Sequence, residues 1–559
     1  MSAEIELINE EYLSVKFQFN QNLVNQIRNL HSRRWNPQKK RWEVHIAHLA
    51  ELMRIFYLHP DEIPPKIVEI YQQRWIKTQL HIKISHTQTF VSGKNIPIEK
   101  IDDELSFPVL GHQYSPKFID GSWDGKKHLF DKRDFSFPTG LLDKVMAIIK
   151  KEGVNYQVID KRHTSNPSLN MKKIKIDLRD YQVEAVEAAL KANRGVLEMA
   201  SGSGKTTVAA MMIYELARPA FFFVHTKDLL YQAKSYFEEY LKKKIGQVGD
   251  GIISIQPITV ATVQTAIKAF GGIYAKEEIE DEEEIGEEDV TDITTKKEDI
   301  KKAINNCEVV FFDECHHIPA ETCYTVAMQT HNAGYRFGLS ATPYRSDRQD
   351  MLIEAALGKK FFSANASYLI KKGHLVAPEI KFIEVPFTKK SKKQDYQVIY
   401  NESIVENDKR NKIIVKEARR LNKEKKSVLI LVSQVKHGKI LKQLFPEARF
   451  VHGNDSSAVR RKALKDLEKK NLLTLIATTL ADEGLDVPTL NAVILAGGGK
   501  SETKALQRIG RALRIAPGKE IGYIIDFMDK ALYIKEHSEK RLEIYKTEPL
   551  FRIVKGNNK

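Results

Sequence analysis

Two series of short apolar runs, separated by helical patterns, constrain the fold of this chain more than any other feature. Many of their residues are β-branched or aromatic, and the runs are nearly continuous rather than alternating. Such runs are typical of buried parallel strands that helices cover on both faces. We therefore expect an α/β protein with two similar lobes. The first series lies at 196–197, 220–224, 258–260, 309–312 and 336–339, and the second at 428–432, 449–451, 473–476, 492–495 and 523–525.

A glycine-rich loop follows the first of these runs and carries the clearest chemical signal. Glycines and then Gly-Lys-Thr, between a strand and a helix, are typical of a loop whose backbone N–H groups and helix dipole surround phosphates. Lys205 is expected to hold the β- and γ-phosphates of ATP, and Thr206 to ligate Mg²⁺. Met199 stands where such loops usually have their first glycine. The expected ATP-binding residues are Ser201, Gly202, Ser203, Gly204, Lys205, Thr206 and Thr207.

Paired carboxylates follow the apolar run at 309–312. They are Asp313 and Glu314, and Cys315 and His316 come next. A hydrolytic nucleotide site needs one carboxylate for the metal and one for the attacking water. We expect Asp313 to ligate Mg²⁺ and Glu314 to orient and deprotonate the water.

Three arginines, Arg508, Arg511 and Arg514, recur at every third position after Gln507. This spacing places them on one face of a helix. We interpret Gln507, Arg511 and Arg514 as catalytic residues of the second lobe, with arginines that reach the γ-phosphate. A solvated basic helix face is the simpler alternative.

Together these motifs resemble those of superfamily 2 helicases of the DExH subgroup, over residues 170–530. The resemblance implies two tandem RecA-like lobes. It implies that Arg179 and Gln182 bind adenine and that Gly484 and Asp486 contact the nucleotide. The motif at 340–342 is expected to couple hydrolysis to unwinding. Expected nucleic-acid contacts of the first lobe are Thr226, Lys227 and Thr265.

The N-terminal region has two clusters that mix basic and aromatic residues. Residues 12–55 resemble a HARP-type domain of annealing helicases, and 114–140 resemble the N-terminal DNA-binding domain of UvsW-type helicases. XPB-like helicases are competing relatives, although their Arg-Glu-Asp loop is not visible here. Basic groups pair with phosphates and exposed tryptophans stack on bases; alternatively, the tryptophans are core residues. The expected contacts are Arg33, Arg34, Trp35, Trp42, Lys117, Trp123, Lys126 and Lys127.

These patterns divide the 559 residues into five parts. We expect small α+β nucleic-acid-binding domains at 1–75 and 76–165, lobes at 166–380 and 381–545, and a C-terminal tail at 546–559. Because both strand series lie beyond residue 165, deletion of 1–165 is expected to leave two folded lobes. The acidic segment 276–292 is interpreted as a mobile surface loop, and the basic segment 389–393 as a solvated face that can also touch phosphates.

Composition limits the partners and the compartment. The 88 basic and 73 acidic residues give a net charge of +15, which suits an acidic partner such as nucleic acid. No apolar run has the roughly 18 residues of a membrane span, and the N-terminus lacks a signal-peptide pattern. Three cysteines are too few for a four-thiolate metal site. We expect a cytoplasmic protein, associated with the nucleoid or, if viral, in the host cytoplasm.

The expected function is an ATP- and Mg²⁺-dependent DNA helicase or translocase. It would act on forked, branched or partly single-stranded DNA in repair, recombination or replication. The UvsW-type resemblance implies 3′-to-5′ movement. Three alternatives stay open: the motor subunit of a restriction system, a clamp that binds nucleic acid under ATP control without unwinding, and an RNA substrate.

Overall fold

The computed structural model describes residues 3–30, 32–72, 80–152, 154, 156–163, 165–174, 176–272, 294–341, 350–386, 395–478, 489–498, 509–510 and 512–556. The chain forms two compact units. The N-terminal unit holds residues 1–166, 327–334 and 346–359, and the two-lobed unit holds 167–326, 335–345 and 360–559. The segments at 276–292 and 389–393 lie outside the described residues.

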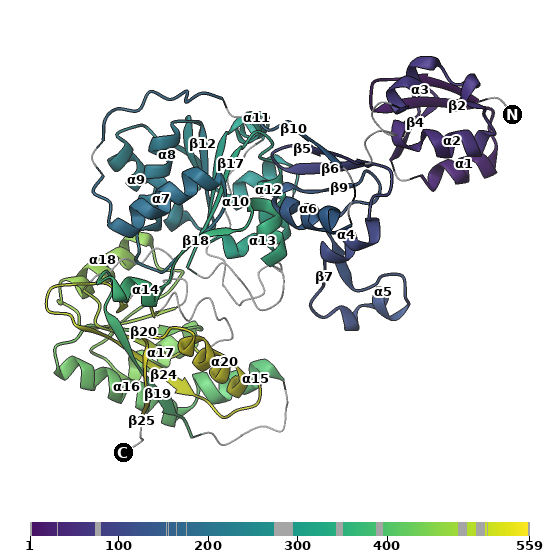
Figure 1. The fold of residues 1–559 in the computed structure, drawn as a ribbon. Coiled ribbons are helices and arrows are strands. Elements are labelled where there is room, and N and C mark those ends of the chain that lie inside the picture. The colour runs from purple at the N-terminus through teal and green to yellow at the C-terminus, as the bar shows by residue number, and fades with distance from the viewer. Residues whose placement is uncertain are drawn as a thin grey trace. The chain divides into compact units, whose positions relative to one another are not determined.

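The N-terminal unit begins with a four-stranded antiparallel sheet in the order β1-β2-β4-β3 (Figure 1). Alternate residues of its strands, such as Leu13, Val15 and Val44, are fully buried, as expected for a sheet with one covered face. They pack with apolar residues of the helices in one core. The elements are β1 (Ala3–Leu7), β2 (Tyr12–Phe17), α1 (Gln21–Arg28), β3 (Arg33–Asn36), β4 (Arg41–His45), α2 (Leu49–Phe56) and α3 (Pro65–Tyr71).

A second sheet follows in the order β10-β5-β6-β9. A two-stranded sheet of β7 and β8 comes between β6 and β9 in the sequence. β10 runs parallel to β5, and the other pairs are antiparallel. The elements are β5 (Leu80–Ile84), β6 (Gln88–Gly93), α4 (Ile98–Glu104), β7 (Ser106–Pro108), α5 (Pro116–Ile119), β8 (Lys126–His128), β9 (Ser136–Pro138), α6 (Leu142–Lys151) and β10 (Tyr156–Asp160).

Helix α13 (Asp350–Leu357) belongs to the N-terminal unit, although the sequence places it within the first lobe. A Cβ on Gly140 would lie 1.9 Å from the Glu354 carbonyl oxygen, so the two backbones touch. Lys144 also lies 3.7 Å from the Glu354 carboxylate. Deletion of 1–165 would therefore remove the packing partner of α13, and the expectation that it leaves two folded lobes stays a prediction.

The first lobe is an eight-stranded sheet in the order β14-β13-β15-β12-β16-β17-β11-β18. All pairs are parallel except β13–β14. Helices lie on both sides of the sheet in Figure 1, and this double cover explains why β12 is buried throughout. The strands are β11 (Arg194–Met199), β12 (Ala220–Val224), β13 (Gly246–Gly249), β14 (Ile252–Ser254), β15 (Ile258–Thr262), β16 (Val309–Asp313), β17 (Tyr335–Ser340) and β18 (Lys360–Ala364). The helices are α7 (Asp180–Ala192), α8 (Lys205–Leu216), α9 (Lys227–Leu241), α10 (Val263–Ala269), α11 (Lys297–Asn306), α12 (Glu321–Met328) and α14 (Ala366–Lys371).

The second lobe is a seven-stranded, wholly parallel sheet in the order β21-β22-β20-β23-β24-β19-β25. The strands are β19 (Ala377–Glu384), β20 (Val428–Val432), β21 (Arg449–Val451), β22 (Thr474–Thr478), β23 (Ala492–Leu495), β24 (Ile521–Met528) and β25 (Arg552–Gly556). The helices are α15 (Tyr396–Tyr400), α16 (Asp408–Lys423), α17 (Val435–Leu444), α18 (Ser457–Glu468) and α20 (Ile534–Lys546).

Every run of the two predicted series forms a strand, and the α/β class with two parallel-sheet lobes is confirmed. Two predicted boundaries are wrong. β19 pairs with β24, so the second lobe already includes residue 377. β25 pairs with β19, so the expected tail contributes an edge strand to the sheet. Among the described residues, no helix is long and apolar enough to cross a membrane.

Candidate nucleotide and nucleic-acid sites

The loop between β11 and α8 has the backbone of a phosphate cradle. Gly202 and Gly204 have φ angles of +81° and +83°, which glycine adopts without strain. Gln182 also lies close to this loop, because a Cβ on Gly204 would lie 2.4 Å from Nε2 of Gln182. The loop thus opens onto the N-terminus of the twelve-residue α8, where backbone N–H groups lack intrahelical partners.

The interior of this loop fits a phosphate group. The Ser203 hydroxyl is buried and has no hydrogen-bond partner among the described residues. A buried hydroxyl without a partner costs about 1–3 kcal/mol, and a ligand oxygen would remove that cost. The ammonium group of Lys205, on the first turn of α8, points to the same site from a largely buried side chain.

Glu314 stands at the carboxyl end of β16, next to Asp313, and its carboxylate faces Lys205. Lys205 Nζ lies 3.4 Å from Glu314 Oε1. The backbone of Glu314 has a φ of +47°, a left-handed conformation that costs about 1–3 kcal/mol outside glycine. This strain directs the side chain to Lys205 and to the end of β17.

Two further side chains hold the other carboxylate oxygen of Glu314. The Ser340 hydroxyl donates to Oε2 at 3.3 Å, and His316 Nδ1 lies 3.4 Å from Oε2. His316 and Ser340 are 3.2 Å apart. The end of β17 and the turn after β16 therefore orient one carboxylate together.

The two carboxyl groups have opposite pKa shifts. Burial raises the pKa of Asp313, and the neighbouring charge of Glu314 raises it further. Burial also acts to raise the pKa of Glu314, but the positive charge of Lys205 and the contact with His316 outweigh it and lower the pKa. Glu314 is thus held as a carboxylate, while Asp313 lies where a cation would favour its ionised form.

The first turn of α7 contacts the phosphate loop through side chains. Gln182 Nε2 and the Tyr181 hydroxyl donate to the Ser203 carbonyl oxygen at 2.8 and 2.7 Å. Gln182 Oε1 accepts from the backbone N–H of Arg179 at 2.9 Å. The expected adenine contact of Arg179 and Gln182 stays a prediction, and it requires the Gln182 amide to exchange these partners.

A short connection between α14 and β19 joins this segment to the second lobe. Lys372 Nζ and His374 Nε2 each lie 2.9 Å from the Asp180 carboxylate. The rings of His374 and Tyr181 are 4.8 Å apart. The residues after His374 pair with the second lobe, since the Val376 N–H donates to the Leu513 carbonyl oxygen at 2.8 Å.

The second lobe reaches the phosphate loop through its predicted arginine segment. A Cβ on Gly202 would lie 3.0 Å from Nε of Arg514, and a Cβ on Gly510 would lie 2.5 Å from Cβ of Ser201. Burial lowers the pKa of Arg514 to about 10, which leaves the guanidinium charged at neutral pH. The predicted residues Gln507, Arg511, Gly484 and Asp486 lie outside the described residues.

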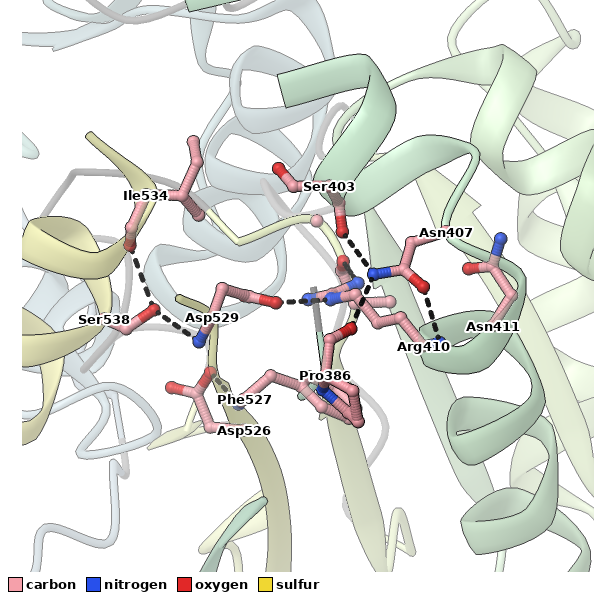
Figure 2. Close-up of polar contacts among 12 residues, drawn as sticks. Pro386, Ser403, Asn407, Arg410, Asn411, Asp526, Phe527, Asp529, Ile534 and Ser538 are labelled. Carbon is pink, nitrogen blue, oxygen red and sulfur yellow. Dashed lines mark hydrogen bonds and ion pairs between the residues drawn. The ribbon is translucent and has the colours of Figure 1, made fainter. Parts of the chain in front are cut away.

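A buried ion network lies at the ends of β23 and β24, the strands that come before and after the arginine segment in the sequence (Figure 2). Arg410, on α16, donates to the Asp529 carboxylate at 3.0 Å and to the Ala496 carbonyl oxygen at 2.5 Å. Its guanidinium also lies 4.5 Å from the centre of the Phe527 ring. Arg541 pairs with Asp526 at 2.9 Å in the same core. A buried arginine of this kind fixes the turn after β23 because unpaired partners would be costly.

The predicted strand contacts of the first lobe have different surroundings. Thr226 caps α9 through its hydroxyl, which accepts from the Leu229 N–H at 3.3 Å. Lys227 pairs with Asp250 at 2.9 Å and remains partly exposed. Thr265 is fully buried and its hydroxyl accepts from Thr262 at 3.0 Å. We therefore do not retain the Thr265 side chain as a nucleic-acid contact.

The first basic-aromatic cluster forms the β3–β4 hairpin. Trp35 and Trp42 are cross-strand partners with ring centres 5.4 Å apart. Trp35 is 48% exposed, while Trp42 packs against the core of the first sheet. Glu43 pairs with Arg34 and with Arg41. A hydrogen bond from Asn36, which has the largest effect, and the contacts with the two arginines lower the pKa of Glu43 to about 2.

The second cluster lies on the loop that joins β7 and β8. Lys117 is exposed, and Lys126 pairs with Asp103 at 3.6 Å. Trp123 is half-buried and its indole N–H donates to the Lys126 carbonyl oxygen at 2.8 Å. Trp123 therefore helps to build the loop. Lys127 lies on β8, where it pairs with Phe107 of β7.

Sequence reasoning missed several residues that complete these sites. The sequence places His316 and Ser340 in motifs without giving either a role, and the structure gives both a contact with Glu314. Asp180 and His374 are far apart in the sequence, so no spacing signal joins them. Tyr114 was visible only as part of a basic-aromatic stretch, and its 80% exposure required the structure.

Three family models match successive parts of the chain. The model "DNA helicase UvsW, N-terminal" matches residues 79–160. "Type III restriction enzyme, res subunit" matches 175–345, and "Helicase conserved C-terminal domain" matches 406–516. The matches cover the loop, the paired carboxylates and the second lobe in order. The chain is therefore similar to superfamily 2 helicases over these three segments.

The chain also resembles whole proteins from viruses and archaea. It is 28% identical to Putative helicase 22 of Sulfolobus islandicus filamentous virus, over 65% of this chain and just under two thirds (66%) of that protein. It is 27% identical to DNA 3'-5' translocase XPB2 of Sulfurisphaera tokodaii, over 61% and 80%. It is 24% identical to ATP-dependent DNA helicase uvsW of Enterobacteria phage T4, over 86% and 99%.

Proposed function

We propose that the chain is an ATP-driven DNA translocase that remodels forked, branched or partly single-stranded DNA. The observation that carries the proposal is the meeting of Lys205, Glu314 and Arg514 at one phosphate loop. Two of these side chains come from the first lobe and the third from the second lobe. A site whose charges come from both lobes changes when the lobes move, which links hydrolysis to motion.

The residues of the site divide the chemistry between them. Lys205 and the backbone N–H groups of the loop bind the phosphates, and Thr206 and Asp313 would hold Mg²⁺, which would supply charge neutralisation. Glu314 accepts a proton from the attacking water, because its lowered pKa keeps it ionised. Ser340 and His316 keep its carboxylate oriented. Arg514 adds positive charge beside the loop.

The proposed DNA substrate and direction are supported by the relatives. The archaeal relative is named a DNA 3'-5' translocase and the phage relative an ATP-dependent DNA helicase. The model that matches residues 79–160 is named for the N-terminal part of the DNA helicase UvsW. We accordingly propose 3′-to-5′ movement, contacts by the N-terminal unit with the DNA backbone, and a cytoplasmic location.

A second candidate is the motor subunit of a restriction system, which the type III restriction model favours for residues 175–345. The two candidates differ in strand separation, because restriction motors move along duplex DNA while a remodelling helicase opens it.

ATP turnover and strand separation should be measured with single-stranded DNA, a fork, a four-way junction, plain duplex and RNA. We expect the fork and junction to be unwound and the fork to stimulate ATP turnover more than plain duplex. Glu314→Gln is the matched inactive control. Stimulation by duplex without unwinding would favour the restriction motor, and stimulation by RNA alone would contradict a DNA substrate.

A further inference from the structure

The loop between β7 and β8, residues 109–125, is a compact projection of the N-terminal unit. β7 and β8 pair from Ser106↔His128 to Pro108↔Lys126, so the loop leaves and returns at one point. Its chain forms two helical turns, at His112–Tyr114 and Pro116–Ile119. Figure 1 shows it extending past β7 with α5 at its far end.

The loop has its own small core, which fixes its shape. The rings of His112 and Phe118 meet edge to face at 4.9 Å. The backbone N–H of Trp123 donates to the Lys117 carbonyl oxygen at 2.9 Å. Gly125 has a φ of +78°, and a Cβ there would lie 2.6 Å from the His112 ring. These contacts all lie within the loop.

An ion network anchors the base of the loop. His128 lies 2.7 Å from the buried Asp102 of α4 and 3.0 Å from Asp124 of the loop. Burial acts to lower the pKa of His128, but the two carboxylates outweigh it and raise the pKa. Lys132 also pairs with Asp102 at 2.9 Å. The projection is therefore tied to α4.

Three large apolar side chains of this ordered loop remain in solvent. Leu110, Tyr114 and Ile119 are 66%, 80% and 73% exposed. Single exposed apolar residues are ordinary, but three strongly exposed ones on one short loop, where Phe118 is also 36% exposed, mark a contact surface. Lys117, in the same helical turn as Ile119, is exposed as well.

We propose that Leu110, Tyr114 and Ile119 form an apolar tip that contacts unpaired bases at the branch point of DNA. The inference rests on the proposed function, since only a branched or partly single-stranded substrate presents such bases. Aromatic side chains stack on any exposed base, and apolar side chains can wedge into a base step. The neighbouring lysines suit the phosphates beside those bases. In this proposal Tyr114, and not Trp123, is the residue that stacks on a base. Trp123 is half-buried and its indole N–H donates to the Lys126 carbonyl oxygen.

The test uses the full chain with Leu110, Tyr114 and Ile119 all changed to Ser. Because these side chains are exposed, the variant should keep its circular dichroism and its melting temperature. A fork with 2-aminopurine at the junction reports stacking, and the rate of strand separation reports opening. We expect the 2-aminopurine signal to disappear and fork unwinding to fall about tenfold. Turnover stimulated by single-stranded DNA should stay unchanged.

Two single variants sharpen this test. Tyr114→Phe keeps the ring and should keep the signal, while Tyr57→Ser, which removes a 94% exposed tyrosine elsewhere in the unit, should change nothing. If the triple variant keeps the wild-type 2-aminopurine signal and fork affinity, the proposed contact with unpaired bases is wrong, and a protein is left as the partner of this surface. If the wild type opens no fork, the proposed function is wrong. The fork affinities of the wild type and the triple variant then test the contact of the tip with bases by themselves.

Discussion

The two lobes share one architecture, and they differ in the loop that follows one of the interior strands. In the first lobe β11 leads through a glycine-rich loop into α8, with Lys205 on its first turn. In the second lobe β20 leads through Ser433 and Gln434 into α17, with the exposed Lys436 near its start. Both sheets are built of buried apolar strands. The comparison shows that the sheet supplies the scaffold and that a few loop residues supply the chemistry.

The strongest test of this difference changes the corresponding lysines. Lys205→Ala should reduce ATP turnover by about 10²- to 10³-fold and weaken ATP binding, because a charge at the phosphates is lost. Lys436→Ala should leave both unchanged, since Lys436 only pairs with Glu406 at the surface. Steady-state ATPase and nucleotide titrations measure both. Equal losses of ATP turnover and ATP binding in the two variants would contradict the difference between the loops of the two lobes.

Glu314→Gln separates chemistry from binding within the first lobe. Turnover should fall by about 10²-fold or more because the amide cannot accept the proton of the water. ATP affinity should persist, since the role lies in the transition state. Ser340→Ala should give a smaller loss of turnover, because it removes only one of the contacts that orient the carboxylate. Near-normal hydrolysis by Glu314→Gln would remove it as the base.

Arg514→Ala tests whether the second lobe contributes to the site. We expect turnover to fall about tenfold or more with little change in ATP affinity, because its charge lies beside the phosphate loop. Lys462→Ala, an exposed position of α18, is the matched control in the same lobe. A parallel loss of affinity and turnover in Arg514→Ala would point to a structural role at the lobe contact.

The smallest effect is expected at the connection between the lobes. His374→Ala removes a contact with Asp180 and with the Tyr181 ring. Because the ion pair is exposed, we expect only a two- to fivefold rise in the KM for ATP, roughly the range of surface pairs. Lys372→Ala should act in the same direction. A change in kcat with an unchanged KM would show that the connection acts on lobe movement instead.

Much of the fold was predictable because buried parallel strands leave a one-dimensional signature. The runs at 220–224 and 428–432 are apolar at every position, and both are central strands. Two strands of the second lobe escaped prediction: the edge strand β25 has no buried residue, and its neighbour β19 alternates buried apolar residues with partly exposed ones, several of them charged. An edge strand buries fewer faces, so its sequence carries a weaker pattern.

The sequence by itself determined the two lobes, the phosphate loop and the paired carboxylates, because local spacing is enough to specify them. Residues 201–207 are contiguous, and Asp313 and Glu314 are adjacent. Only the tertiary structure decided which distant groups meet there: Ser340 and His316 at Glu314, His374 at Asp180, and Arg514 at Gly202. It also decided which aromatic residues are available, burying one edge of Trp123 and exposing Tyr114. Exposure and long-range contact depend on how the chain packs in three dimensions, and neighbours in sequence do not record that.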